Sequence, residues 1–147
     1  MAKGIENSDF KDCLKRRKIV KFVPAKKLAS RELKIAEEDL KAASESLNAG
    51  KEKWATVQAY YAMFHTARAL LYSKGYREKS HYCLIAAIKA LFVVEGLLDL
   101  NLVEVFAMAK VLRENAYYDN EYSVESAASL IEKTKKFLAT GKKILGR

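Results

Sequence analysis

The chain has 147 residues, half of them hydrophobic, which suffices for one domain with a single buried core and leaves little room for a second. Only six glycines and one proline occur, so the composition favours long helices with short connections and argues against a turn-rich sheet protein. The 27 basic and 18 acidic side chains give a net charge of +9, which suits an anionic partner or, equally well, a solvated lysine surface.

The N-terminal region is predicted to be a separate basic extension over residues 1–24, followed by a helical bundle over residues 25–147. Residues 7–23 can form a short helix with Asn7 or Ser8 as its N-cap, ending before Pro24. The KRRK run at residues 15–18 is either a phosphate-binding patch or, as we favour, the solvated face of a terminal helix.

The two cysteines, Cys13 and Cys83, form no CxxC motif and no Cys/His cluster with zinc spacing, so we expect reduced thiols in an intracellular protein. The start of the chain has no apolar signal-peptide core. Apolar stretches such as LIAAIKALFVV are broken by lysine and are too short to cross a bilayer. We therefore expect a cytoplasmic protein with no membrane contact.

Two long helices come next. Residues 25–48 carry apolar side chains at three- and four-residue steps, and Gly50 follows as a terminator. Residues 51–74 are apolar nearly all round, which indicates a helix packed on more than one side and ending at Gly75. One face of this second helix carries a polar seam, which consists of Gln58, Tyr61, His65, Arg68 and Tyr72. We favour hydrogen bonds of His65 and Arg68 in the core or at a dimer interface over a ligand groove.

The rest of the chain predicts three more helices. After a turn at GYREK, Ser80 can cap a helix that ends at Gly96. A helix over residues 101–119 turns an apolar stripe that includes Tyr117 inward, with Arg113 beside the stripe. Because an arginine bordering a core stays charged, Arg113 must find an acceptor in a cleft, an interface or a fixed carboxylate. Ser123 can cap the closing helix.

The fold class that follows is all-α, an antiparallel up-and-down bundle of four to five long helices plus a short N-terminal helix. The nearly all-round apolar character of residues 54–71 and 82–94 also predicts a homodimer through helix faces. No Gly-rich phosphate loop, HExxH motif, nucleophile elbow or EF-hand loop occurs, so the sequence lacks the motifs of most enzyme classes. We expect no cofactor and no metal site.

The block AYYAMFHTARALLYSKGYREKSHYCLIAAIKALFV, followed later by LRENAYYDNEYSVESA and a basic last helix, resembles the HEPN family, the higher eukaryote and prokaryote nucleotide-binding domain. The likeness runs from about residue 27 to the end. Matching positions in the central helix are Tyr61, Phe64, His65, Ala67, Arg68 and Leu70. The turn KSH at residues 79–81 matches as well, and Arg113 matches the signature arginine.

This resemblance implies a helical bundle, commonly a homodimer, encoded beside a minimal nucleotidyltransferase in a prokaryotic toxin–antitoxin pair. Family members that cut RNA resemble one another in carrying an arginine, four to six residues, then a histidine that handles the proton of the attacking ribose hydroxyl. Here the histidine slot is occupied by Tyr118 to Asn120. A tyrosine with a pKa near 10 is a poor proton acceptor at neutral pH, which argues against nuclease activity.

Three interpretations remain open. The first, which we favour, is a non-catalytic module that binds a nucleotide, an RNA or a nucleotidyltransferase. The second is a metal-independent ribonuclease that uses Arg113 with His81 or His65. The third is a helical interaction protein without a ligand. The predicted nucleotide- or RNA-binding residues are Arg113, Tyr117, Tyr118, Arg68, Lys79 and His81.

Overall fold

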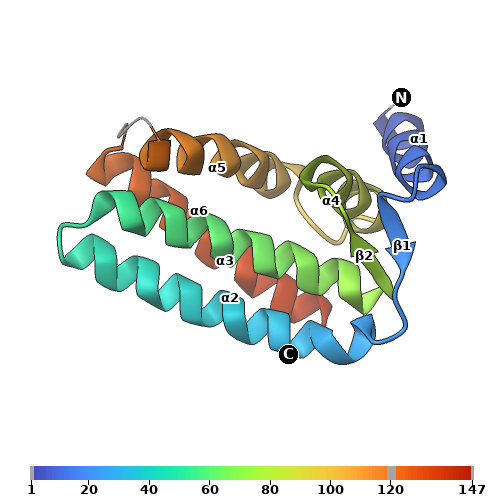
Figure 1. Ribbon diagram of the computed structural model, residues 1–147, viewed down its shortest axis with the longest axis horizontal. Helices are drawn as coiled ribbons and strands as arrows, with labels where there is room; N and C mark the ends of the chain where they lie inside the picture. Colours follow the sequence, from blue (N-terminus) through green and yellow to red (C-terminus); the bar gives the residue numbers. More distant parts are fainter. Residues whose placement is uncertain (1, 119–121, 147) are drawn as a thin grey trace.

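The computed structural model describes residues 2–118 and 122–146, with side chains over residues 8–117 and 122–146. The elements in chain order are α1 (Ala2–Lys15), β1 (Ile19–Lys21), α2 (Ala25–Asn48), α3 (Glu52–Ser73), β2 (Tyr76–Glu78), α4 (His81–Ile88), the π-helical η1 (Lys89–Val93), α5 (Leu100–Tyr118) and α6 (Val124–Ile144) (Figure 1).

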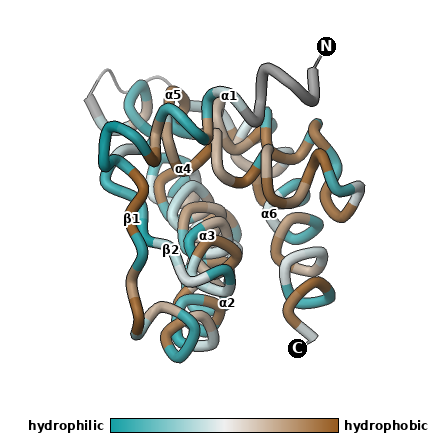
Figure 2. The backbone as a smooth tube through the Cα atoms, turned by 90° about the vertical axis from the view of Figure 1, so that its right-hand side faces the viewer, coloured by the Kyte–Doolittle hydropathy of each residue, from teal (hydrophilic) through white to brown (hydrophobic). Residues whose placement is uncertain are grey.

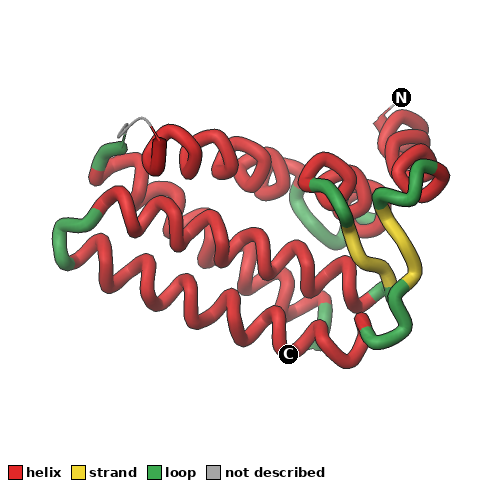
Figure 3. The backbone as a smooth tube through the Cα atoms, in the orientation of Figure 1, coloured by secondary structure: helices red, strands yellow, loops and turns green. Residues whose placement is uncertain are grey.

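The expected all-α bundle is confirmed. The long helices α2, α3, α5 and α6 run side by side, and α4 with α1 closes one end (Figures 1 and 3). Within the described residues the only strands are β1 and β2, which form one short antiparallel pair. None of the helices described is both long enough and apolar enough to span a bilayer.

Helix α3 is the centre of the core, as its nearly all-round apolar sequence predicted. It packs against α2, α5, α6 and α4, and the end-on view of Figure 2 shows it among the coils of the other helices. Its fully buried side chains include Met63, Leu70 and Leu71. The chain itself therefore covers most of the apolar surface of residues 54–71, which removes one reason to expect a dimer through that helix.

Close contact between α3 and α6 depends on Gly141. A Cβ atom at this position would lie 2.8 Å from Cγ2 of Thr66, which is closer than carbon atoms approach in folded proteins. Thr66 is fully buried, and its hydroxyl is satisfied by donation to the carbonyl of Ala62 at 2.8 Å. The small residue thus lets the last helix seal the core.

The predicted helix ends are largely confirmed. Ser80 accepts a hydrogen bond from the backbone N–H of Cys83 at 3.1 Å, and Ser123 accepts one from that of Ser126 at 3.0 Å. Gly75 follows the end of α3 with a φ of +82°, a conformation that other residues rarely adopt. The caps Ser80 and Ser123 directly precede apolar segments, and this local pattern is why they could be predicted from the sequence.

The predictions for residues 7–23 and for the GYREK turn were wrong. Helix α1 begins at Ala2 and ends at Lys15, and Arg17 follows with a φ of +59°. Residues 19–21 then pair with residues 76–78, so that Ile19 lies opposite Glu78 and is buried. Strand pairing across so much intervening chain leaves no periodic signal in either segment. The helix predicted from Ser80 to Gly96 also differs, because it changes to the π-helical η1 at Lys89.

The expectation of two reduced cysteines was also wrong, because Cys13 of α1 and Cys83 of α4 form a disulfide. Their Cα atoms lie 5.7 Å apart although 70 positions separate them in the chain. Packing of α1 against α4 brings them together, and both side chains are fully buried. Because tertiary packing joins these two cysteines, no local spacing motif predicts their disulfide.

Reducing this disulfide is expected to lower the free energy of unfolding. Closing a loop with a sequence separation of 70 restricts the unfolded chain, which corresponds to a stabilisation of about 4 kcal/mol in the chain-entropy model. Urea unfolding with and without a reductant measures the difference. The double variant Cys13→Ser/Cys83→Ser is the control, since its stability should not respond to the reductant. An unchanged wild-type midpoint would contradict the prediction.

Candidate functional site

Arg113 lies on α5 with its guanidinium over two tyrosine rings of α3. Its Cζ atom is 5.1 Å from the ring centroid of Tyr60 and 5.7 Å from that of Tyr61. The guanidinium contacts one carboxylate in the described part of the chain, and only weakly, with Nη2 3.9 Å from Oε1 of Glu114. Its Nε is buried without a hydrogen-bond partner among the described residues. A charge in this condition is available to an external acceptor.

The ring of Tyr60 connects Arg113 to His81. It stacks on the His81 ring, with centroids 6.0 Å apart and planes inclined by 24°, and on Phe106 at the same centroid distance. Tyr60 itself is buried, whereas Tyr61 is 38% exposed and is the more solvent-accessible of the two rings. We name the group of Arg113, Tyr60, Tyr61, His81 and Phe106 the Arg113 cluster.

Burial in this aromatic environment keeps His81 uncharged. The pKa of His81 is lowered to about 4, first by burial and then by the positive charges of Lys110 and Arg113, against a smaller opposing effect of Glu114. Its Nε2 is buried and has no hydrogen-bond partner among the described residues. A neutral imidazole with an unpaired ring nitrogen therefore faces the same aromatic ring as an under-paired guanidinium.

Tyr60 cannot supply a proton acceptor in place of the histidine. Burial raises the pKa of Tyr60 to about 12, although the positive charge of Arg113 acts in the opposite direction. The side chain therefore stays a neutral phenol at physiological pH. Its part in the Arg113 cluster is to present a ring face and a hydroxyl.

His65 and Arg68 of the polar seam lie elsewhere and are already engaged. Nδ1 of His65 is 2.5 Å from Oε2 of Glu32, and its Nε2 is 3.9 Å from Oδ2 of Asp39. Arg68 makes a double hydrogen bond to the buried Glu78, with its Nη2 2.9 Å from Oε2. These side chains join α3 to α2 and β2, which is the internal role that we favoured for the seam.

The tyrosines after Arg113 do not extend the cluster in the way that the sequence suggested. Tyr117 was expected to face the core but is 48% exposed, and its ring meets that of Trp54 edge-on at 6.2 Å. Lys53 lies over the same ring, 5.4 Å from its centroid. The side chain of Tyr118 and the rest of the histidine slot, residues 119 and 120, lie outside the described residues. Lys79 is exposed, just before His81.

Residues 29–145 match the HEPN domain family, which is most of the chain. The chain belongs to the HEPN family. A relative from Methanocaldococcus jannaschii, named "Putative toxin MJ0605", is 34% identical over 92 residues, covering 62% of this chain and 69% of the relative. The resemblance inferred from the central helix, the KSH turn and Arg113 is thereby confirmed.

In this HEPN domain the sequence missed two members of the cluster, Tyr60 and Phe106. Neither residue was singled out in the sequence; both lie in the hydrophobic core, and their ring contacts with His81 depend on how α3, α4 and α5 align. Tyr61 was placed in the polar seam, but its neighbour across the helices is Arg113. These contacts depend on how the antiparallel helices α3 and α5 are aligned, and a single sequence does not specify that alignment.

The depressed pKa of His81 predicts a pH dependence of stability. The unfolded chain binds a proton at this histidine near pH 6.5, whereas the folded HEPN domain does so only near pH 4. Stability from this group is therefore complete above pH 6.5 and is lost as the pH falls towards 4. NMR titration of the ring protons measures the pKa directly, and His81→Phe should flatten the stability profile in this range. A midpoint near 6.5 would show that the ring is solvated.

Proposed function

We propose that this HEPN domain is the toxin-type component of a toxin–antitoxin system and that its Arg113 cluster binds RNA or a nucleotide. The observation that carries the proposal is the condition of Arg113, which lies over Tyr60 and Tyr61 with a buried, unpaired Nε. The name of the archaeal relative supports the toxin assignment.

The chemistry of the cluster suits a ligand that combines phosphate with a base. A guanidinium can hold two phosphate oxygens through parallel N–H donors, and an exposed tyrosine ring offers a stacking surface to a base. Tyr61 is the partly exposed ring beside Arg113. The net charge of +9 attracts polyanions at long range, so an RNA strand gains more from this surface than a small neutral ligand does.

Ribonuclease activity is the second candidate, and one observation favours it. Arg113 and His81 both contact the ring of Tyr60, which brings the two functional groups into one cluster. A neutral imidazole can accept a proton from a ribose hydroxyl while a guanidinium stabilises the phosphate. Burial of His81 weighs against this role, because a general base must reach the substrate. His65 is a weaker choice, since Glu32 and Asp39 hold it.

The partners that we propose are a second copy of the chain and a minimal nucleotidyltransferase, in the cytoplasm. Three of the exposed aromatic side chains are proposed to mediate this association, and they are Trp54, Tyr61 and Tyr82, with 45%, 38% and 61% of their surface exposed. Aromatic residues of this kind are enriched in protein interfaces. They come from α3 and α4, the helices that also contribute to the Arg113 cluster.

Binding of a short single-stranded RNA and of ATP should depend on Arg113. The variant Arg113→Ala is expected to weaken binding by about 1–3 kcal/mol, because a charge-assisted contact to phosphate is lost. Fluorescence anisotropy at two salt concentrations measures the loss and the share due to phosphate. Arg31→Ala is the matched control, since Arg31 is an exposed arginine of α2. Equal binding by wild type and Arg113→Ala would refute the proposed site.

Incubation of the purified protein with RNA should show weak or no cleavage. The chain has no histidine after His81, so the usual partner of the signature arginine is absent. Cleavage lost in both Arg113→Ala and His81→Ala, but kept in His65→Ala, would establish the second candidate. Melting temperatures of all three variants separate loss of function from loss of fold.

Light scattering at micromolar protein should report twice the mass of the chain. Tyr82→Glu places a charge on the most exposed of the three aromatics and is expected to shift the protein towards the monomer. Val124→Glu serves as the control, because Val124 is half exposed at the start of α6. A wild-type monomer at this concentration would rule out the homodimer.

A further inference from the structure

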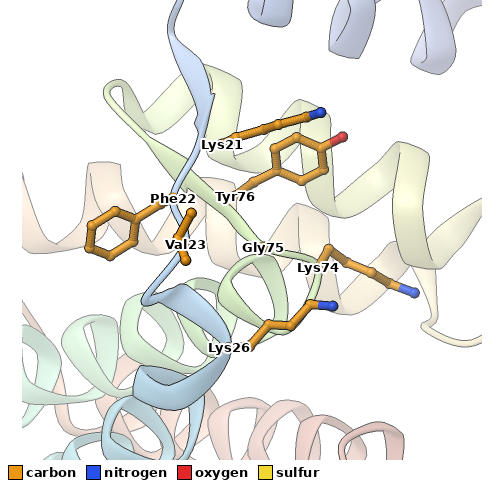
Figure 4. A pocket seen from close by; sticks show the side chains of 7 residues that line it. All are labelled: Lys21, Phe22, Val23, Lys26, Lys74, Gly75 and Tyr76. Atoms are coloured by element: carbon orange, nitrogen blue, oxygen red, sulfur yellow. The ribbon is translucent and has the colours of Figure 1, made fainter.

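A hollow of about 370 Å³ lies where β1 turns into α2 and α3 turns into β2. Its lining residues are Lys21, Phe22, Val23, Lys26, Lys74, Gly75 and Tyr76. The side chains of the three lysines and of Tyr76 extend to the same side of this corner, whereas Phe22 points away from them (Figure 4). We name Lys21, Lys26, Lys74 and Tyr76 the lysine pocket.

Backbone contacts join the segments that carry the lysine pocket. Lys21 and Tyr76 are directly paired in the strand register, and the N–H of Phe22 donates to the carbonyl of Gly75 at 2.9 Å. Gly75 takes a φ of +82°, and a Cβ at this position would lie 3.8 Å from Cε of Lys26. The stem of Lys26 thus passes close to Gly75, so lysines from distant parts of the chain line the same hollow.

The three ammonium groups have no carboxylate partner in the part of the chain that the structure describes. Lys74 lies over the ring of Phe92, 5.4 Å from its centroid. Like charges gathered around one hollow repel one another, and no ion pair of the described residues offsets the repulsion. An anion in the hollow would relieve it.

Helix stability accounts for only one of these lysines. Lys74 is the C-cap of α3, where a positive charge is favourable for the helix dipole. Lys26 occupies the first turn of α2, where a positive charge is unfavourable, and that turn contains no acidic residue. A cation in this position is costly for the helix alone. It becomes favourable when an anion binds between it and the other two lysines.

We propose that the lysine pocket binds a compact oligophosphate, of the kind carried by a nucleoside triphosphate or by the 5′ end of a primary transcript. Lysine binds phosphate as a flexible point charge, and three lysines match the several adjacent charges of such a group. The Tyr76 hydroxyl can donate to a phosphate oxygen. The volume exceeds what one phosphate requires. This site is separate from the Arg113 cluster and does not depend on the function proposed for it.

The test is a titration of the full chain with inorganic tripolyphosphate, followed by ATP, 5′-triphosphate RNA and the same RNA with a 5′-hydroxyl. In the Arg113→Ala background, which removes the other proposed RNA site, and at about 0.15 M salt, where surface charges are screened, we expect saturable binding of the first three and at least tenfold weaker binding of the last. The double variant Lys21→Ala/Lys26→Ala should weaken tripolyphosphate binding on the order of tenfold or more. Comparing ATP with the triphosphate RNA identifies the preferred source of the oligophosphate.

Two matched variants distinguish the lysine pocket from general charge and from the Arg113 cluster. Lys27→Ala/Lys34→Ala removes the same charge from exposed positions of α2 outside the pocket, and Arg113→Ala removes the other site. The Lys27/Lys34 variant should bind tripolyphosphate like the wild type, and the saturable binding that remains in Arg113→Ala should be lost when Lys21→Ala/Lys26→Ala is added. The proposal is overturned if the Lys27/Lys34 variant weakens binding as much as the pocket variant does, if wild-type binding does not saturate, or if the 5′-hydroxyl RNA binds as tightly as the triphosphate RNA.

Discussion

The structure depends on the burial of α3 on several sides at once. A helix that is apolar around most of its circumference must be enclosed, and α2, α4, α5 and α6 supply the enclosure. Gly141 shows how tight the fit is, because even one methyl group there would meet Thr66. With α3 fixed in this way, each polar side chain on it must meet a partner from a particular neighbouring helix or strand.

The polar side chains on and around α3 fall into two groups, those paired with an acid inside the chain and those open to a ligand. His65 contacts Glu32 and Arg68 contacts Glu78, and both pairs are largely removed from solvent. A buried charge without its partner is strongly destabilising, so such pairs secure the alignment of the helices. Arg113 meets aromatic rings and one weak acid contact. The same kind of side chain is therefore internally satisfied at one place and open to a ligand at another.

Much of the fold could be predicted from sequence because its signals are local. Helix α2, with Gly50 behind it, and the caps Ser80 and Ser123 follow from periodicity and from residues adjacent to the elements that they end. The β1–β2 pair and the disulfide could not be predicted, since each joins segments whose proximity arises only after packing. The candidate site could be predicted in part. Arg113 was identified by its place beside the apolar stripe, whereas its contacts with Tyr60 and Tyr61 required the alignment of two helices.

The disulfide also closes part of the linear chain into a covalent loop. The loop runs from Cys13 to Cys83 and contains β1, α2, α3 and β2, so the central helix lies on a closed loop of chain. His81 lies two residues inside the point of closure. A protease that cuts the connection at residues 49–51 would leave both pieces joined through sulfur, and they would separate on a gel only after reduction. The helix that organises the core is thus retained even when the backbone beside it is broken.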